Sequence, residues 1–277
     1  MNNNNTFFEN LQLQQSQKWI RAIDSKKIFE WIDDLFFILF PEQVLKQSEI
    51  KIRWNRNKID FENLLIKIGI DKSDSEIKEI SDTFYDDIPK IYDFLQKDAS
   101  AIFDTDPAAD CISEIINSYP GFLAIAFYRI ANAIASKKIQ MLPRIISEYA
   151  HSKTGIDIHP NATIDVPFVI DHGTGIVIGE TSIIGKNVTI YQGVTLGALQ
   201  VSKDLEEKKR HPTVEDHVVI YANATILGGS TIIGNNSVIG GNTFVTRSVN
   251  PYSTVMQASK NNIIIQPDTE NNNHFSI

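Results

Sequence analysis

The chain has 277 residues, 42% hydrophobic and 22% charged, and its 34 acidic and 26 basic side chains give a formal net charge of −8. This length predicts one large or two modest domains with a sizeable core. The acidic balance argues against nucleic acid or an anionic membrane as the main partner, and a single cysteine, Cys111, excludes an internal disulfide framework and cysteine-rich metal sites.

Two features of the sequence predict a cytoplasmic protein. The chain has no run of about 18 uninterrupted apolar residues, so no membrane-spanning helix is expected. Its first five residues are polar or uncharged, unlike the basic start of a secretory signal peptide.

Residues 1–150 are predicted to form an α-helical domain whose first dozen residues are a flexible polar tail. Apolar residues recur at three- and four-residue steps from Trp31 to Leu39, which predicts a helix that Pro41 ends. The same stripe follows Pro120 and predicts a second helix.

The period changes to six residues in the region 151–260. The aliphatic residues at this step are Ile158, Ile164, Ile170, Ile178, Ile184, Ile190, Leu196, Val214, Ile220, Ile226, Ile233, Ile239 and Val245. A six-residue period fits neither a helix nor an ordinary hairpin stack, and it predicts a solenoid of very short strands with glycine or asparagine at the corners. At three strands per coil, these steps make about four coils. A charged loop, 199–212, interrupts them, and a flexible polar tail is predicted over 261–277.

Asp157 and His172 are candidate functional residues on this pattern. His172 follows Asp171 on a glycine-flanked turn where the six-residue register slips, so its side chain is expected to leave the packed wall. Asp157 lies about one coil earlier, within reach of the same corner. From the residues alone, two interpretations remain open: Asp157 and His172 form a functional pair, or they are two solvated surface groups.

Four segments identify the family that the chain resembles. They are residues 104–110, 155–160, 171–181 and 210–212. Together with the six-residue repeat, they resemble the serine O-acetyltransferases of the hexapeptide-repeat acyltransferase superfamily. The resemblance implies an α+β fold in which an N-terminal α-helical domain is followed by a left-handed parallel β-helix.

The resemblance implies transfer of an acetyl group from acetyl-CoA to the L-serine hydroxyl, which gives O-acetyl-L-serine in cysteine biosynthesis. An attacking hydroxyl needs a base that titrates near neutrality, and a carboxylate holds such a histidine in the right tautomer. The resemblance assigns His172 as this base and Asp157 as its partner, with His211 as a secondary catalytic or orienting residue.

The remaining site residues are also implied by the resemblance. Arg210 and His211 would bind the serine carboxylate, because a guanidinium can bind it bidentately. Asp106, followed by Pro107, and Asp171 would hold the ammonium group.

Acetyl-CoA is the implied co-substrate, and five small residues match the family's coenzyme groove. They are Gly197, Ala198, Ala222, Gly240 and Gly241. Their size would let the pantetheine arm approach the backbone.

The implied partners are L-serine, L-cysteine as a feedback inhibitor, and other copies of the chain in a homotrimer or hexamer. Ile277 would enter the active site of O-acetylserine sulfhydrylase, because the family's tails typically end in isoleucine.

Three alternatives remain at this stage. In the first, the acceptor is a sugar or another small hydroxyl compound. In the second, the protein is a zinc-dependent solenoid similar to γ-type carbonic anhydrases, and in the third it is a catalytically silent scaffold. No metal is expected, because the remaining histidines lack ligand spacing.

Overall fold

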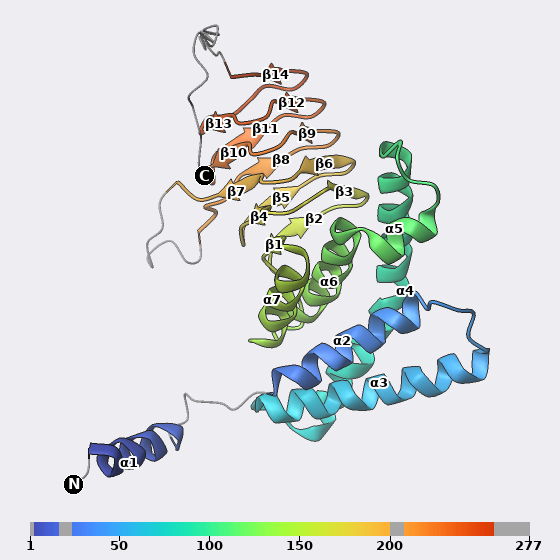
Figure 1. Ribbon diagram of the computed structural model, residues 1–277, viewed down its shortest axis with the longest axis vertical. Coiled ribbons are helices and arrows are strands. Elements are labelled where there is room, and N and C mark those ends of the chain that lie inside the picture. Colours follow the sequence, from blue (N-terminus) through green and yellow to red (C-terminus); the bar gives the residue numbers. More distant parts are fainter. Residues whose placement is uncertain (1–2, 17–23, 200–207, 258–277) are drawn as a thin grey trace, which may run out of the picture.

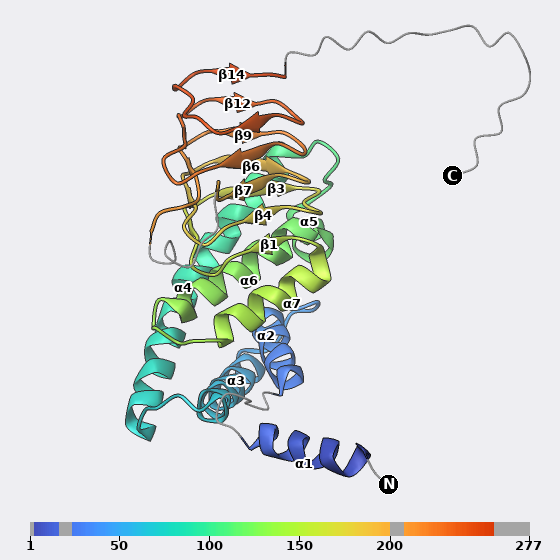
Figure 2. The same cartoon turned by 90° about the vertical axis from the view of Figure 1, so that its left-hand side faces the viewer.

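The computed structural model describes residues 3–16, 24–199 and 208–257, which form a helical part followed by a β-solenoid (Figure 1). The predicted α+β class and the predicted order of the two parts are therefore confirmed. The left-handed coil stays a prediction. The last helix ends at Thr154 and the first strand begins at Asp157. Figure 2 shows the coils stacked one above another, with the helices gathered at the β1 end.

The helical part contains the two helices that periodicity predicted. Within the described ranges the helices are α1 (Asn3–Gln15), α2 (Ser25–Leu39), α3 (Gln47–Ile68), α4 (Asp74–Thr105), α5 (Ile112–Ser118), α6 (Pro120–Ala135) and α7 (Leu142–Thr154). Helix α2 ends two residues before Pro41, and it buries Ile28, Ile32 and Leu35 completely. Helix α6 begins at Pro120, whose fixed φ suits a first helical position.

Helix α1 differs from the flexible tail expected at the start of the chain. Residues 3–15 are helical, and the described side chains of residues 6–16 are all exposed. Figure 1 shows α1 apart from the other helices. The segment contains three glutamines and two leucines, which favour helix locally without a packed face.

The solenoid is built from parallel strands of two to four residues. In the described part of the chain they are β1 (Asp157–Ile158), β2 (Thr163–Ile164), β3 (Phe168–Asp171), β4 (Val177–Ile178), β5 (Ile183–Ile184), β6 (Val188–Tyr191), β7 (Thr195–Gly197), β8 (Thr213–Val214), β9 (Val219–Ile220), β10 (Thr225–Leu227), β11 (Ile232–Ile233), β12 (Val238–Ile239), β13 (Phe244–Val245) and β14 (Thr254–Val255). They make three sheets, which we call face A (β1-β4-β7-β10-β13), face B (β2-β5-β8-β11) and face C (β3-β6-β9-β12-β14).

The register of face A confirms the six-residue pattern. Equivalent aliphatic residues pair from coil to coil, in the order Ile158, Ile178, Leu196, Ile226 and Val245. All five are buried, because the second residue of each of these strands points into the prism. The periodic aliphatic residues therefore form the solenoid core.

The expected number of about four coils is wrong, because the described residues form about five. The last coil contains β13, a single bridge between Ile233 and Val249, and β14. Val249 lies four residues after Val245 instead of six, so counting six-residue steps missed this coil.

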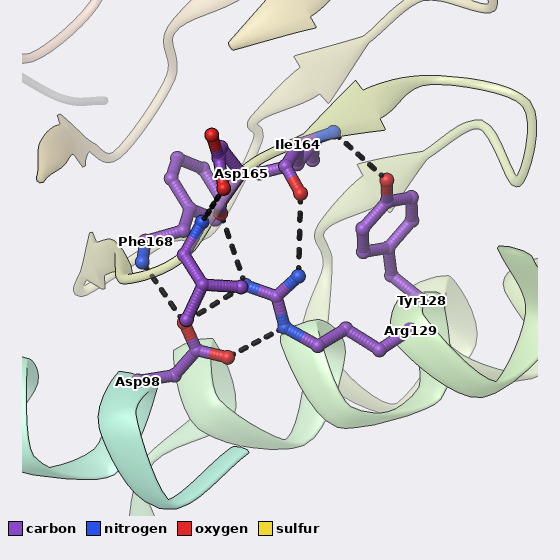
Figure 3. Close-up of polar contacts among 7 residues, drawn as sticks. Asp98, Tyr128, Arg129, Ile164, Asp165 and Phe168 are labelled. Atoms are coloured by element: carbon purple, nitrogen blue, oxygen red, sulfur yellow. Dashed lines mark hydrogen bonds and ion pairs between the residues drawn. The ribbon is translucent and has the colours of Figure 1, made fainter. Parts of the chain in front are cut away.

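A buried ion pair joins the helical part to the solenoid (Figure 3). Asp98 of α4 accepts hydrogen bonds from Arg129 Nε (2.6 Å) and Nη2 (2.8 Å), and its side chain has 0% exposure. The Asp98 carboxylate also accepts from the Phe168 backbone N–H of β3 (2.9 Å). Arg129 in turn donates to the carbonyls of Ile164 and Asp165. One ion pair therefore connects α4 and α6 to the first coil.

Tyr128 of α6 adds a second connection beside this pair. Its hydroxyl donates to the Ala162 carbonyl (2.6 Å) and accepts from the Ile164 N–H (3.2 Å). The first coil thus meets the helices through polar groups that satisfy its otherwise unpaired backbone.

None of the described helices is long and apolar enough to span a membrane.

We expect Asp98→Ala to lower the free energy of unfolding by about 3–5 kcal/mol, because it leaves the Arg129 guanidinium buried without its counter-ion. The matched control is Asp93→Ala, which breaks the exposed Asp93–Lys97 pair and should cost less than about 1 kcal/mol. Urea unfolding at fixed protein concentration measures both. Equal effects of the two substitutions would contradict the role of the buried pair.

Candidate active site

His172 occupies a strained corner of the solenoid. At the corner from face C to face A, Gly175, Gly193, Asn223 and Asn242 hold equivalent positions in the left-handed backbone region, and the longer turn of the first coil also places His172 in that region, with φ of 57°. Histidine adopts this region less readily than glycine. The position therefore favours a role for the imidazole, and that side chain is 71% exposed.

Acidic residues from both parts of the chain gather at this corner. Asp171 Oδ1 lies 3.7 Å from His172 Nδ1. Asp106, at the end of α4, shares a small hollow with Asp171 and Tyr191. The helical part therefore brings Asp106 to the solenoid within one chain.

The chain around Asp106 explains this placement. Pro107 disfavours helical backbone at the preceding residue, so Asp106 is extended (φ −103°, ψ 105°) and α4 ends there. Pro107 itself is exposed.

Two donors hold the Asp106 carboxylate. The Tyr119 hydroxyl donates to Oδ2 (2.7 Å), and the Ala108 N–H donates to Oδ1 (2.8 Å). These two hydrogen bonds lower the pKa of Asp106 below its ordinary value, and the bond from the Tyr119 phenol has the larger effect. The carboxylate in turn raises the pKa of Tyr119 to about 12. Sequence reasoning missed Tyr119, because nothing local shows that its phenol reaches back to Asp106.

The turn that bears His172 lies directly on the segment before Asp157. Gly175 N–H donates to the Gly155 carbonyl (2.8 Å), and a Cβ on Gly173 would lie 2.5 Å from Ile156 Cδ1. Among the described residues, no ion pair joins Asp157 to His172.

Asp157 instead lies beside Glu148 and His151, at the end of α7. One ligand atom from each of the three residues lies within 4.8 Å of the others. This group has the residue types of a divalent-cation site. However, Glu148 already pairs with Arg144, at 2.5 Å, and nothing else at the group points to a bound ion.

His211 and Arg210 lie at a different corner, between faces A and B. His211 is 8% exposed, and its Nδ1 accepts from the Thr181 backbone N–H (3.1 Å). Nδ1 therefore carries no proton, and the neutral ring is protonated at Nε2. Burial, with Arg210 and Lys209 nearby, lowers the pKa of His211 to about 4. A Cβ at Gly179 would lie 2.0 Å from His211 Cδ2, so the bare glycine makes room for the ring.

Arg210 pairs with Glu180, which also accepts from Asn161 Nδ2 (3.0 Å). These contacts lower the pKa of Glu180 even though burial opposes the shift. Sequence reasoning did not identify Glu180 as a partner of Arg210.

The coenzyme candidates divide between the same two corners. Ala222, Gly240 and Gly241 lie at the corner from C to A, whereas Gly197 ends β7 and Ala198 follows it at the corner from A to B. A Cβ on Gly240 would lie 2.9 Å from the Val255 carbonyl oxygen, and one on Gly241 would lie 3.0 Å from that of Ala222. Close stacking of coils therefore already requires small residues at positions 240 and 241.

One chain thus carries two separate groups of candidates. We call them the acidic edge (Asp106, Asp171 and His172) and the basic edge (Arg210 and His211). The described residues show no contact between these two edges. Ile277, and residues 200–207 of the loop 199–212, lie outside the described residues.

Two family descriptions match the chain. "Serine acetyltransferase, N-terminal" matches residues 67–126, and "Hexapeptide repeat of succinyl-transferase" matches residues 175–198 and 213–247.

The chain is similar to solved serine acetyltransferases over most of its length. It is 34% identical to serine acetyltransferase 1 of Entamoeba histolytica, solved in complex with L-cysteine, with a TM-score of 0.75 over 85% of this chain and 87% of that one. Isoform 3 of the same organism, also in complex with cysteine, is 31% identical, with a TM-score of 0.77 over 86% and 84% of the two chains.

Curated relatives match a shorter stretch of the chain at higher identity. The chain is 49% identical over 148 residues to a plasmid-encoded serine acetyltransferase of Synechococcus elongatus, covering 52% of this chain and 46% of that protein. It is 49% identical over 126 residues to the serine acetyltransferase of Bacillus subtilis, covering 46% and 56%. The chain therefore spans about half the length of these curated relatives.

We expect the His211 imidazole of the folded protein to stay neutral, with its proton on Nε2, until the pH falls to about 4. In the unfolded chain the same ring gains its proton near pH 6.5. The unfolded state therefore binds more protons between these values, and the free energy of unfolding falls as the pH falls from about 6.5 to 4. Imidazole NMR shifts, in native buffer and in urea, measure both titrations. A folded midpoint near 6.5 would contradict this assignment.

Proposed function

The chain belongs to the serine acetyltransferase family, and we propose that it transfers an acetyl group from acetyl-CoA to the hydroxyl of L-serine. The observation that carries the proposal is the acidic edge, where Asp106 and Asp171 converge beside an exposed histidine held in the left-handed region. An ammonium-bearing acceptor suits two carboxylates, whereas a neutral sugar does not require them.

His172 acts as the general base in this proposal. The serine oxygen attacks the thioester carbonyl while His172 takes the hydroxyl proton, so a C–O bond forms. The tetrahedral intermediate then collapses, the C–S bond breaks, and the proton passes to the departing CoA sulfur. Asp157 would orient the imidazole. Gly155 and Ile156 contact the turn that bears His172, and Asp157 follows them as the first residue of β1.

The basic edge would bind the serine carboxylate. Arg210 supplies the charge, and a serine carboxylate would compete with Glu180 for the guanidinium. His211 suits an orienting role better than that of a base, because its Nδ1 lone pair faces the Thr181 N–H and its Nε2 carries the proton. Nε2–H remains a neutral donor for a carboxylate oxygen.

Acetyl-CoA would lie along the solenoid corners, with its pantetheine arm near the small residues at both edges. A backbone N–H at this groove would stabilise the oxyanion of the intermediate. L-Cysteine keeps the ammonium and carboxylate of L-serine, and the E. histolytica relatives are complexes with it. We therefore infer that cysteine takes the serine position as an inhibitor.

A homotrimer would complete the site, because the two edges would meet only between neighbouring copies. Helices α4 and α6 pack against β3 and so cover the start of face C. Faces A and B instead present exposed apolar residues to solvent. They are Val177 and Phe244 on face A, and Ile183 and Ile232 on face B. These faces suit packing against other copies.

Helix α3 offers a second surface, which favours pairing of trimers into a hexamer. Ile52, Ile59 and Ile66 follow one another at seven-residue steps and are 69%, 57% and 52% exposed. Seven-residue spacing of aliphatic residues is typical of helix pairing. Cytoplasmic location and binding of a sulfhydrylase through Ile277 stay predictions.

We expect His172→Asn to lower kcat roughly 10²–10⁴-fold, the usual contribution of a general base. Asparagine also tolerates the left-handed backbone at this corner, so the substitution tests the imidazole without straining the turn. Thiol release from acetyl-CoA, with L-serine and a panel of sugars as acceptors, measures the activity. Asp157→Asn should reduce kcat less. Near-normal turnover by His172→Asn, or wild-type preference for a sugar, would contradict the proposal.

We expect mixed oligomers to regain activity when one chain carries His172→Asn and the other Arg210→Ala. Each variant alone lacks one edge in every site. In a trimer that contains both variants, about a third of the sites would combine two intact edges from neighbouring chains. Co-expression with two affinity tags isolates the mixed species for assay. A site confined to one chain would leave them inactive, and a monomer by light scattering would also contradict the assembly.

A further inference from the structure

Tyr119 holds Asp106 at the acidic edge from a different element. Its backbone precedes α6 as the N-cap, whereas Asp106 ends α4. The half-buried ring packs against the helical core, and its hydroxyl reaches Asp106 Oδ2 at 2.7 Å. The phenol thus connects the packed helices to a carboxylate in the hollow shared with Asp171.

Asp106 needs such a contact to keep one orientation. It lies past the last helical residue in extended backbone, where several side-chain rotamers are accessible. The Ala108 N–H binds Oδ1 and the Tyr119 hydroxyl binds Oδ2, so both oxygens are fixed. Each carboxylate oxygen keeps a further lone pair for a substrate donor.

The contact also has an electrostatic effect. Asp171 lies in the same hollow, and a second negative charge disfavours ionisation of Asp106. The Tyr119 and Ala108 donors favour the ionised form, and His172 acts in the same direction when it is protonated. Glu114, another acid in this region, accepts a hydrogen bond from the Asp110 N–H (2.8 Å). Asp106 therefore remains a charged partner for an ammonium group.

We propose that Tyr119 is a positioning residue for recognition of the substrate's ammonium group, acting through the Asp106 carboxylate. This inference rests on the proposed serine acetyl transfer. It limits the effect of Tyr119 to the amino-acid substrate, because the hydroxyl contacts neither His172 nor the coenzyme corners.

The test compares wild type with Tyr119→Phe, which keeps the ring and removes the hydroxyl. A hydrogen bond to a charged group contributes enough that KM for L-serine should rise roughly tenfold or more. KM for acetyl-CoA, and kcat at saturating serine, should change less than about twofold. The matched control is Tyr149→Phe, which removes an equivalent bond to Asp33 (2.6 Å) within the helical part and should leave both KM values unchanged.

A double-substitution cycle separates positioning from general stability. If Tyr119 acts through Asp106, Tyr119→Phe should raise KM for serine little further in an Asp106→Asn background. Additive effects would overturn the inference, as would equal increases for both substrates or an unchanged KM for serine in Tyr119→Phe. Failure of the wild type to acetylate serine would instead overturn the proposed function.

Discussion

The buried pair between Asp98 and Arg129 is the constraint on which the site depends. It attaches α4 and α6 to the first coil through the Phe168 N–H and two backbone carbonyls (Figure 3). Asp106 is the C-cap of the helix that carries Asp98, so the position of α4 against the solenoid determines whether Asp106 meets Asp171. A misplaced helix would leave half of the acidic edge unformed.

The solenoid restricts where functional side chains can lie. Its inward positions are filled by aliphatic residues, and its short strands leave the corners as the places where side chains project. His172, Arg210 and His211 all lie at corners. Because face A separates the two corners, one chain presents the acidic and basic edges apart. Assembly of copies therefore follows from the geometry of the prism as well as from its apolar faces.

The sequence predicted features that depend on local repetition. The six-residue aliphatic pattern identified the inward residues of the solenoid, and helical spacing identified α2 and α6. The fifth coil was not predicted, because Val249 follows Val245 after four residues and not after the six-residue step. The site residues were predictable as types, since the resemblance named them, and their grouping into two edges was not. That grouping depends on which corner each loop reaches in three dimensions.

Contacts between distant segments explain what the sequence could not show. Tyr119 is 13 residues from Asp106, and Thr181 is 30 from His211, and neither separation matches a repeat or a helical face. The two site histidines also have opposite environments. His211 is buried, neutral and bound at Nδ1, whereas His172 is exposed on a strained turn. An exposed imidazole can exchange a proton with a substrate and solvent, and a buried neutral one can present a fixed donor. The environments, more than the residue type, therefore distinguish the base from the orienting residue.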